Sequence, residues 1–290
     1  MNQAPLQNDL TPSKMLDETA AYIASVQSLD GSIAWFIDGS ADPWDHIEAA
    51  MGLATRGQID AAKNAYNFLV EQQLANGGWF VSYEQGKPKD TSRIESNFVA
   101  YIATGIWHLY LVTDDKTVLA TYWPMVSRAM QLVVSLQGTY GEIYWAIDSE
   151  TGVQEDALVT GCSSIFHSLG CAIAIADTLQ APSAMLKQTR QKLKTALTAH
   201  PEAFDRTWDS KARYSMDWFY PVLTGVYSGA DARARLAARW DEFVEDKLGC
   251  RCEKQEPWVT VAESCELVMS LLAAGDHARA VEVYSWLQQW

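Results

Sequence analysis

The sequence is poor in basic residues. Its 290 residues include 22 lysines and arginines against 36 aspartates and glutamates, which gives a formal net charge of −14 at pH 7. Nucleic acids and anionic membrane surfaces are bound by clustered Lys and Arg side chains, so we expect neither as a partner. Most of the negative charge is expected to form a solvated surface.

Long apolar runs and targeting signals are also missing. No uninterrupted apolar stretch reaches the roughly 18 residues that a membrane-spanning helix needs. Residues 1–12 contain no basic segment followed by an apolar one, so they do not read as a signal peptide. Five cysteines, an odd number, do not form a secreted disulfide framework. We therefore expect a cytoplasmic protein without a membrane span.

Sequence patterns for cofactors and metals are absent as well. There is no glycine-rich nucleotide loop and no G-x-S-x-G nucleophile turn. The segment Cys250-Arg251-Cys252 lacks the spacing of a zinc knuckle, and Cys265 falls within a predicted helix. The sequence therefore predicts neither a cofactor nor a bound metal.

What the chain does have is a repeated helix ending. Three predicted helices end in a glutamine, which is followed by a short turn with glycine and then by an aromatic pair. The three instances are Gln27 with Gly31 and Trp35-Phe36, Gln73 with Gly77 and Trp79-Phe80, and Gln137 with Gly141 and Tyr144-Trp145. Recurrence of one motif indicates a repeat of one supersecondary unit.

Apolar periodicity predicts eleven helices, six outer and five inner, in one all-α domain over residues 14–290 after a loose arm over 1–13. The outer helices are expected near 14–28, 58–75, 116–137, 183–200, 230–246 and 277–290. The inner helices, rich in small residues, are expected near 45–56, 94–113, 155–178, 217–229 and 258–275. Short extended pieces around 79–83 and 142–147 are expected as hairpins in the loops.

Alternating inner and outer helices close into an α/α toroid of helical hairpins. An open superhelix of the tetratricopeptide kind is the structural alternative, and long irregular units with all long loops on one face favour the toroid. A ring of six hairpins needs a twelfth helix. We expect either imperfect closure at the C-terminus or a chain that continues past Trp290.

The long loops deliver aromatic and acidic residues to one rim of the ring, where the inner helices begin. In Asp42-Pro43-Trp44-Asp45-His46, the proline precedes a helix whose N-terminus favours anions and polar ligands. Stacking faces beside acids suit polyhydroxylated ligands. The candidate binding residues are Trp44, His46, Arg93, Glu95, Trp145, Trp218, Trp258 and Glu263. Helix caps, packing wedges and a structural ion pair between Arg93 and Glu95 are the alternative interpretations.

The repeated helix endings resemble those of terpenoid cyclases and protein prenyltransferases, whose fold is a toroid. Over most of its length the chain also resembles orphan bacterial prenyltransferase-like proteins, with Pro257-Trp258-Val259-Thr260 to Trp286 similar to their C-terminal part. The chain departs from these enzymes at their chemistry. Thr113-Asp114-Asp115-Lys116 does not supply the Asp-x-Asp-Asp acid of class II cyclases, and the Asp-x-Cys zinc set of prenyltransferases is missing.

A second resemblance is to six-hairpin glycosidases of the glucoamylase type. The helix from Asp45 to Leu53 is similar to the one that follows their Trp-Pro-Arg-Asp motif, with Trp44 in place of the arginine. That likeness implies that Asp45 holds sugar hydroxyls. Glu155-Asp156 is similar to their Glu-Glu pair, whose first member is the general acid. Pro257-Trp258 followed by Thr260 matches a late helix start, and their general base comes in a loop beyond this chain.

Three functional hypotheses remain open. The first is an enzyme acting on a carbohydrate or glycoconjugate, with Glu155 as proton donor, its pKa raised by Asp156 and by burial. In it, Asp45, Arg93 and Glu95 hold hydroxyls, and Trp44, Trp145 and Trp258 stack on the sugar. The second is a prenyltransferase- or cyclase-like protein, whose aromatic rings stabilise a carbocation of an isoprenoid substrate. The third is a toroid that binds a ligand or partner without catalysis. The sequence leaves the oligomeric state open.

Overall fold

The computed structural model describes residues 12–290, so most of the predicted N-terminal arm lies outside the described residues. All eleven predicted helices are present. The outer helices are α1 (Pro12–Val26), α3 (Ile59–Gln72), α5 (Lys116–Ser135), α7 (Ala184–Ala199), α9 (Gly229–Ala238) and α12 (His277–Leu287). The inner helices are α2 (Pro43–Thr55), α4 (Ser96–Thr113), α6 (Val159–Thr178), α8 (Ser215–Leu223) and α11 (Val261–Ala273).

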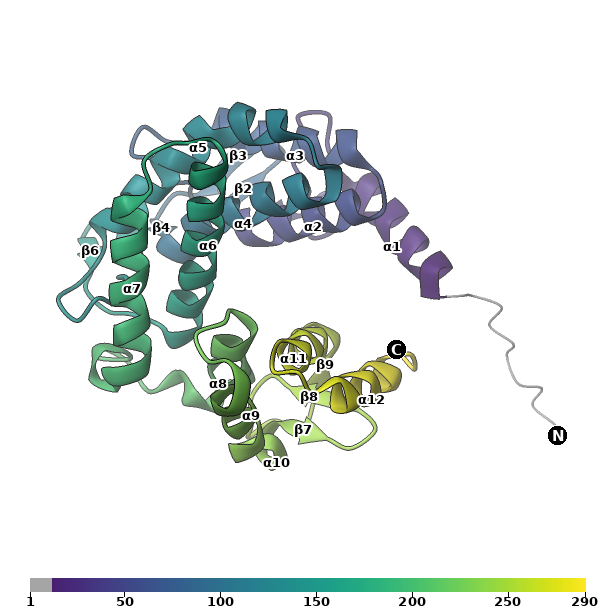
Figure 1. The fold of residues 1–290 in the computed structure, drawn as a ribbon. Coiled ribbons are helices and arrows are strands. Elements are labelled where there is room, and N and C mark those ends of the chain that lie inside the picture. Colours follow the sequence, from purple (N-terminus) through teal and green to yellow (C-terminus); the bar gives the residue numbers. More distant parts are fainter. Residues whose placement is uncertain (1–11) are drawn as a thin grey trace.

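The helices form an α/α toroid, as the sequence predicts. Successive inner helices pack on one another in the order α2, α4, α6, α8 and α11, and each outer helix packs against an inner one. Figure 1 shows the result as a C that surrounds a central space and opens between α1–α2 and α11–α12. The long outer-to-inner loops gather at one end of the inner helices, which is the rim that the sequence predicts.

The inner helices pack closely because their contact residues are small. At Gly105 of α4, an added Cβ would lie 2.6 Å from Ile47 of α2. The hydroxyls of Thr104 on α4 and Ser168 on α6 hydrogen-bond at 2.9 Å. Helix α6 is long and apolar enough to cross a membrane by composition, but 67% of its apolar window is buried within the protein. That burial is what a core helix shows.

The repeated glutamines connect neighbouring outer helices. Each glutamine Nε2 donates to the carbonyl of the glycine four residues later and to a carbonyl on the next outer helix. The bonds are Gln27 to Gly31 and Ala61 (3.1 and 2.9 Å), Gln73 to Gly77 and Met125 (2.9 and 3.0 Å), and Gln137 to Gly141 and Thr189 (3.0 and 3.0 Å). We call each such unit a glutamine clamp. The repeat therefore has a structural cause, independent of any catalytic family.

Each clamp also requires its glycine. Gly31, Gly77 and Gly141 have φ of +92°, +93° and +98°. A Cβ on any of the three would overlap a backbone carbonyl of the next outer helix. Only glycine combines the left-handed backbone with this close approach.

Nine short strands form three three-stranded antiparallel sheets in the loops of the described residues. The strands are β1 (Ser40–Ala41), β2 (Ser82–Glu84), β3 (Lys87–Asp90), β4 (Arg93–Glu95), β5 (Ala146–Asp148), β6 (Gly152–Gln154), β7 (Val244–Glu245), β8 (Gly249–Arg251) and β9 (Val259–Thr260). Only the pieces around 79–83 and 142–147 were expected to be extended. The others are two to four residues long and carry no readable alternation.

Several helix boundaries differ from the prediction. Helix α6 begins at Val159, so Glu155 and Asp156 lie in the preceding loop. The helix predicted over 230–246 is broken after Ala238 into α9 and the short α10 (Trp240–Phe243), which leads into β7. Two 3₁₀ turns, η1 (Pro201–Ala203) and η2 (Lys211–Arg213), precede α8.

The buried apolar residues form two clusters. The larger lies among α2 to α7, and the smaller lies among α8, α9, α11 and α12. Trp44 and Tyr227 pack against both clusters. The single domain over 14–290 stays a prediction, and Trp44 joins its two parts.

We predict that Gly77→Ala lowers the free energy of unfolding by about 3 kcal/mol or more, because strain at positive φ adds to the overlap with the Arg128 carbonyl. Gly57→Ala is the matched control, since Gly57 has φ of +77° with nothing within 4 Å of an added Cβ. The control should lower the free energy of unfolding by only about 1–2 kcal/mol, because it introduces only the strain of a left-handed backbone. Urea denaturation of both variants measures the difference, and equal costs would contradict a packing role for the clamp.

Candidate active site

Asp42 fixes the start of α2. Its Oδ1 accepts hydrogen bonds from the backbone N–H groups of Trp44 (2.8 Å) and Asp45 (3.0 Å), which makes it the N-cap. Its Oδ2 accepts from Nε1 of Trp35 at 2.7 Å. Pro43 at the first helical position has no N–H to satisfy. Asp42 therefore sets where Trp35, Trp44 and Asp45 stand on the rim.

Trp44 stands between two hollow spaces. Its ring stacks on Tyr101 of α4 with 4.1 Å between centroids and 2° between planes. Its Nε1 donates to Glu48 Oε1 at 2.8 Å, and the Tyr101 hydroxyl donates to the same oxygen at 3.0 Å. Glu48 thus holds both rings in one orientation.

On the loop side of Trp44 lies a pocket of about 560 Å³, which we call the outer pocket. Its lining residues are Trp35, Asp42, Trp44, Asp45, Val81, Ser82, Asp90, Arg93, Glu95, Asn97, Phe98, Thr160 and Met216. Glu95 on β4 pairs with Arg93, whose Nε lies 2.8 Å from Glu95 Oε1. The pocket brings together the predicted residues Trp44, Asp45, Arg93 and Glu95.

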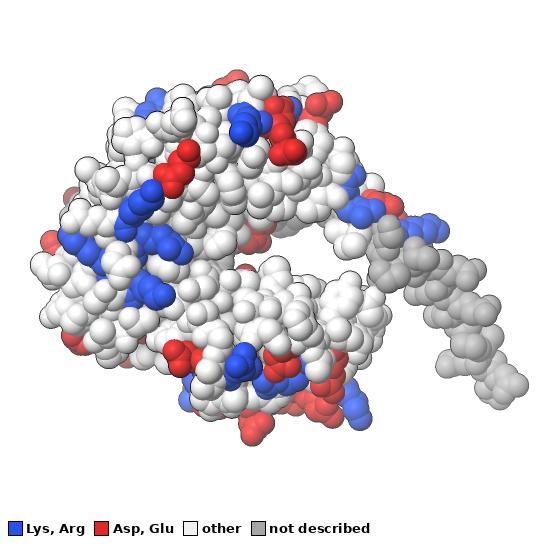
Figure 2. All heavy atoms as spheres, viewed as in Figure 1, with Lys and Arg blue, Asp and Glu red and all other residues white. Residues whose placement is uncertain are grey.

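On the ring side of Trp44 lies a second space of about 400 Å³, which we call the inner cavity. It is lined by Glu48, Met51, Tyr101, Thr104, Ser164, His167, Tyr220, Leu223, Thr224, Ala262, Cys265, Glu266 and Met269, so all five inner helices contribute. No lysine or arginine is among these described lining residues. Figure 2 shows the central hollow of the C, with acidic side chains visible inside it.

The carboxyls around these spaces have raised pKa values. Burial and then the nearby charges of Asp42 and Glu48 raise the pKa of Asp45 to about 7, although its side chain opens into the pocket. Burial, with the charges of Glu48 and Glu263, raises the pKa of Glu266 to about 8. Burial also raises the pKa of Glu48 and of Glu95 above 4.5. Carboxyls that hold a proton at neutral pH in a pocket are candidate general acids.

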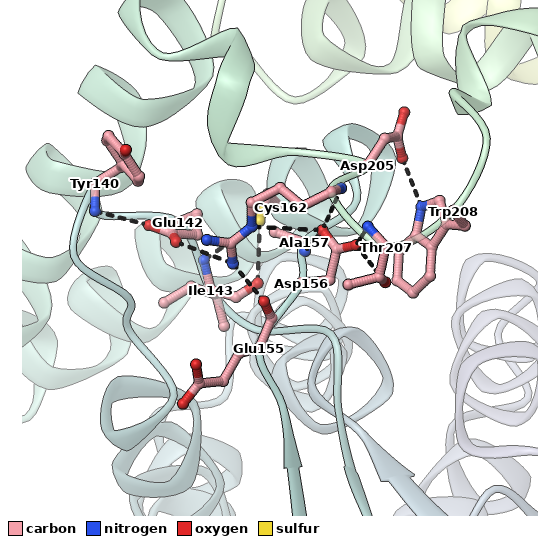
Figure 3. A network of polar contacts seen from close by, with 11 residues as sticks. Tyr140, Glu142, Ile143, Glu155, Asp156, Ala157, Cys162, Asp205, Thr207 and Trp208 are labelled. Carbon is pink, nitrogen blue, oxygen red and sulfur yellow. Dashed lines mark hydrogen bonds and ion pairs between the residues drawn. The ribbon is translucent and has the colours of Figure 1, made fainter.

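Glu155 and Asp156 lie elsewhere and differ from the prediction. Glu155 is exposed, and Figure 3 shows its carboxylate pointing away from Asp156. The expected burial of Glu155 is therefore wrong, because the β6–α6 loop turns this side chain outward. No residue that lines the two spaces described above is Glu155 or Asp156.

Asp156 is buried and connects two loops. Its carboxylate accepts from the backbone N–H groups of Ala157 (2.7 Å), Arg206 (3.0 Å) and Thr207 (2.6 Å) and from the Thr207 hydroxyl (2.7 Å). Burial alone would raise the pKa of Asp156, but these hydrogen bonds outweigh it and lower the pKa. Figure 3 shows the network, which anchors the loop after α7 to the loop before α6. Its geometry is that of a structural carboxylate.

His46 and Trp218 are buried in the core and do not lie on the rim. Ile33 N donates to His46 Nδ1 at 3.0 Å, so Nε2 carries the proton and donates to Ala65 O at 2.9 Å. Burial lowers the pKa of His46, which favours this neutral ring. Trp218 is 1% exposed, and its Nε1 donates to Arg235 O at 2.8 Å. Helical geometry turns both side chains toward the core. His46 follows Asp45, which faces outward from α2, and Trp218 follows Asp217 in α8.

The remaining predicted residues lie on the rim, outside both spaces. Trp145 packs edge-on against Trp208 with 5.7 Å between ring centroids. Trp258 is 49% exposed. Thr260 is the N-cap of α11: its hydroxyl accepts from the backbone N–H of Glu263 and donates to the Glu263 carboxylate. Their predicted roles in substrate binding stay predictions.

Sequence reasoning assigned no role to Trp35, Asp42 or Glu48, although they lie in the rim loop and helix start that it singled out, and it missed Glu266. A signal for two of them was present, because Asp42, Asp45 and Glu48 recur every three residues and share one face at the start of a helix. Glu266 is an acid within an apolar helix that also carries Ser264 and Cys265. Such a residue in an inner helix of a ring is a candidate for the central space.

No protein-family model matches the chain. The MMP endo-(1,4)-3-O-methyl-alpha-D-mannosidase of Mycolicibacterium hassiacum is 43% identical over 276 residues, which cover 95% of this chain and 75% of that protein. Among solved structures, a glycosidase variant in complex with glucose aligns with a TM-score of 0.74 at 16% identity, covering 96% of this chain and 83% of that chain.

A mannosylglycerate hydrolase of glycoside hydrolase family 63 from Thermus thermophilus, in complex with glucose, aligns with a TM-score of 0.71 at 13% identity, covering 93% of this chain and 90% of that chain. At these identities the two structures establish the shared fold. The resemblance to prenyltransferases and terpenoid cyclases is not supported, and the isoprenoid substrate has no support either. In this chain the glutamine clamps account for the repeated helix endings.

We predict that Asp45→Asn raises the melting temperature at pH 8, on the order of 2 °C. The pKa of Asp45 is about 7 in the folded protein and near 3.8 when unperturbed, so its contribution to stability is lost as pH rises from about 4 to 7. The variant avoids the charge beside Asp42 and Glu48, and the difference should shrink toward pH 4. Scanning calorimetry at several pH values tests this, with the exposed Asp209→Asn as control for loss of one charge. A lower melting temperature at pH 8 would contradict the electrostatic account.

Proposed function

Because the chain belongs to the family of the Mycolicibacterium 3-O-methyl-mannosidase and is a glycosidase-type enzyme, we propose that it hydrolyses internal α-(1,4) bonds of a 3-O-methylated mannose polymer. The chain matches that relative over 95% of its length at 43% identity, which supports carrying over the substrate class. A neutral polysaccharide also suits an acidic protein, since such a substrate does not require a basic binding surface.

One observation supports the chemistry most directly. Asp45 opens into the outer pocket with a pKa of about 7, so a large share of the molecules carry a proton on this carboxyl at neutral pH. Glycosidases need a protonated carboxyl beside the glycosidic oxygen, and burial with like charges is how proteins keep such a group protonated. Asp42 and Glu48 supply the like charges here.

We assign the activation of water to Glu95. It lines the same pocket as Asp45 but comes from β4, a different element. Its ion pair with Arg93 favours the ionised form and opposes the effect of burial on its pKa. Among the other acids lining the pocket, Asp42 is already engaged as N-cap and by Trp35, and Asp90 accepts from Ser92 N at 2.8 Å.

The proposed reaction consumes one water. Asp45 donates its proton to the glycosidic oxygen, and the bond from that oxygen to the anomeric carbon breaks, releasing one part of the chain as an alcohol. Water adds to the anomeric carbon and gives a proton to Glu95. Proton exchange with solvent restores both carboxyls. Trp35, 54% exposed, and Trp44 offer faces against which sugar rings can pack.

Hydrolysis of a synthetic 3-O-methylated α-(1,4)-mannoside oligomer tests the function. Mass spectrometry of the products should show internal cleavage, with oligomeric fragments on both sides of the broken bond. Release of monosaccharide alone would contradict internal cleavage, and no cleavage of this substrate would contradict the proposed function.

Asp45→Asn should reduce kcat/KM by about 10²–10⁴-fold, because an amide cannot donate this proton. In the wild type, kcat/KM should fall as pH rises through about 7, since Asp45 loses its proton there. This fall of kcat/KM above pH 7, the alkaline limb of the pH profile, should be missing from the residual activity of the variant. Glu155→Gln tests the competing prediction from sequence, and a larger loss there than in Asp45→Asn would overturn our assignment of the acid.

Glu95→Gln should also reduce kcat/KM by about 10²–10⁴-fold. Burial raises the pKa of Glu95, so the wild-type rate should fall as pH decreases through a value above 4.5, where the base takes up a proton. The variant should lose this acidic limb and keep the alkaline one. The exposed Glu84→Gln on β2 is the matched control. A variant that keeps the acidic limb would show that another group activates water.

A further inference from the structure

The inner cavity has one apolar wall that the proposed reaction does not use. Met51 of α2 and Leu223 of α8 contribute to this wall, and Ala262, Cys265 and Met269 of α11 complete it. Met269 lines the cavity and is 48% exposed, so a ligand can reach its side chain. Apolar side chains on one part of a cavity lining favour a ligand that has an apolar part.

The polar side chains that line the cavity include no lysine or arginine; they are Glu48, Tyr101, Thr104, Ser164, His167, Tyr220, Thr224 and Glu266. Glu266 and Glu48 lie near enough that the charge of Glu48 contributes to the raised pKa of Glu266, about 8. At neutral pH most Glu266 side chains are therefore protonated, and a protonated carboxyl is a hydrogen-bond donor. The cavity thus combines an apolar wall with a donor on α11.

A methyl ether is complementary to an apolar wall beside a hydrogen-bond donor. Methylation replaces a hydroxyl, which both donates and accepts, by an oxygen that only accepts and by an apolar methyl group. A donor together with an apolar wall satisfies both parts. A carboxylate in the same place would instead favour the unmethylated hydroxyl, because only the hydroxyl can donate to it.

The cavity is also close to the proposed reaction. The stacked Trp44 and Tyr101 separate it from the outer pocket, and Glu48 is bonded to both rings while lining the cavity. Asp45 is the residue next to Trp44 and lines the outer pocket. A sugar chain that crosses the edge of Trp44 therefore presents one sugar to each space. An enzyme that cleaves internally has to hold sugars on both sides of the bond.

We propose that the inner cavity is the subsite that recognises the O-methyl group of the substrate, with Met51 and Met269 against the methyl carbon and Glu266 donating to the ether oxygen. The inference rests on the proposed function and adds to it a determinant of specificity. In this proposal the inner cavity selects the methylated sugar, while Asp45 and Glu95 carry out hydrolysis in the outer pocket.

The test compares kcat/KM for two α-(1,4)-mannoside oligomers of equal length, one methylated at O3 and one unmethylated. The wild type should prefer the methylated oligomer. Met269→Gln, close in shape but polar, should reduce this preference about tenfold or more, mainly through slower cleavage of the methylated oligomer. Met185→Gln is the matched control, because Met185 is 64% exposed on the outer helix α7. It should leave the preference unchanged.

A pair of variants at Glu266 tests the donor. Glu266→Gln keeps a donor and should keep the preference, whereas Glu266→Leu should lose it. An unchanged preference in both Met269→Gln and Glu266→Leu, with wild-type circular dichroism, would overturn the subsite. An equal loss in Glu266→Gln and Glu266→Leu would overturn the donor role. These outcomes differ from failure of the proposed function, in which the wild type cleaves neither oligomer.

Discussion

The hydrogen bonds of one buried carboxylate position the whole candidate site. Asp42 is 7% exposed and accepts from two backbone N–H groups of α2 and from the Trp35 indole. As N-cap it begins the helix that carries Trp44, Asp45 and Glu48, and as a negative charge it raises the pKa of Asp45. One side chain therefore sets the geometry of the proposed acid and, after burial, contributes to its raised pKa. Loss of such a cap alone typically costs about 1 kcal/mol, so its larger contribution here is to the arrangement of the site.

Neighbouring carboxyls on the rim and inside the ring raise one another's pKa values. Asp45 in the outer pocket has a pKa of about 7, and Glu266 in the inner cavity has one of about 8, with Glu48 contributing to both. Each carboxyl is stabilised in its protonated form by its neighbours and by burial. Crowding of these carboxyls lowers the free energy of unfolding, and such a loss of stability is common at functional sites. The clamps and cores of the surrounding helices offset that cost.

The sequence specifies the helices and the rim more clearly than the site. Apolar periodicity and small residues predicted all eleven helices, and Asp45, Arg93 and Glu95 were placed on the correct rim. Spacing could not tell which side chains at a helix start face inward, so His46 and Trp218 were placed on the rim although both are buried. It also could not show that the β6–α6 loop turns Glu155 to solvent. Glu48 and Glu266 meet only because helices far apart in the chain close around one space.

The glutamine clamps have a mechanical consequence. In the described part of the chain they join α1 to α3, α3 to α5 and α5 to α7, whereas the elements from α8 onward pack around their own smaller apolar cluster. The clamped helices thus form one part of the ring, and the packing of α6 on α8 joins it to the second part, with Trp44 in contact with both apolar clusters. The second part is therefore held to the ring by side-chain packing, whereas the first is also held by hydrogen bonds between its outer helices. Figure 1 shows the opening of the C between the free ends of these two parts, at α1–α2 and at α11–α12.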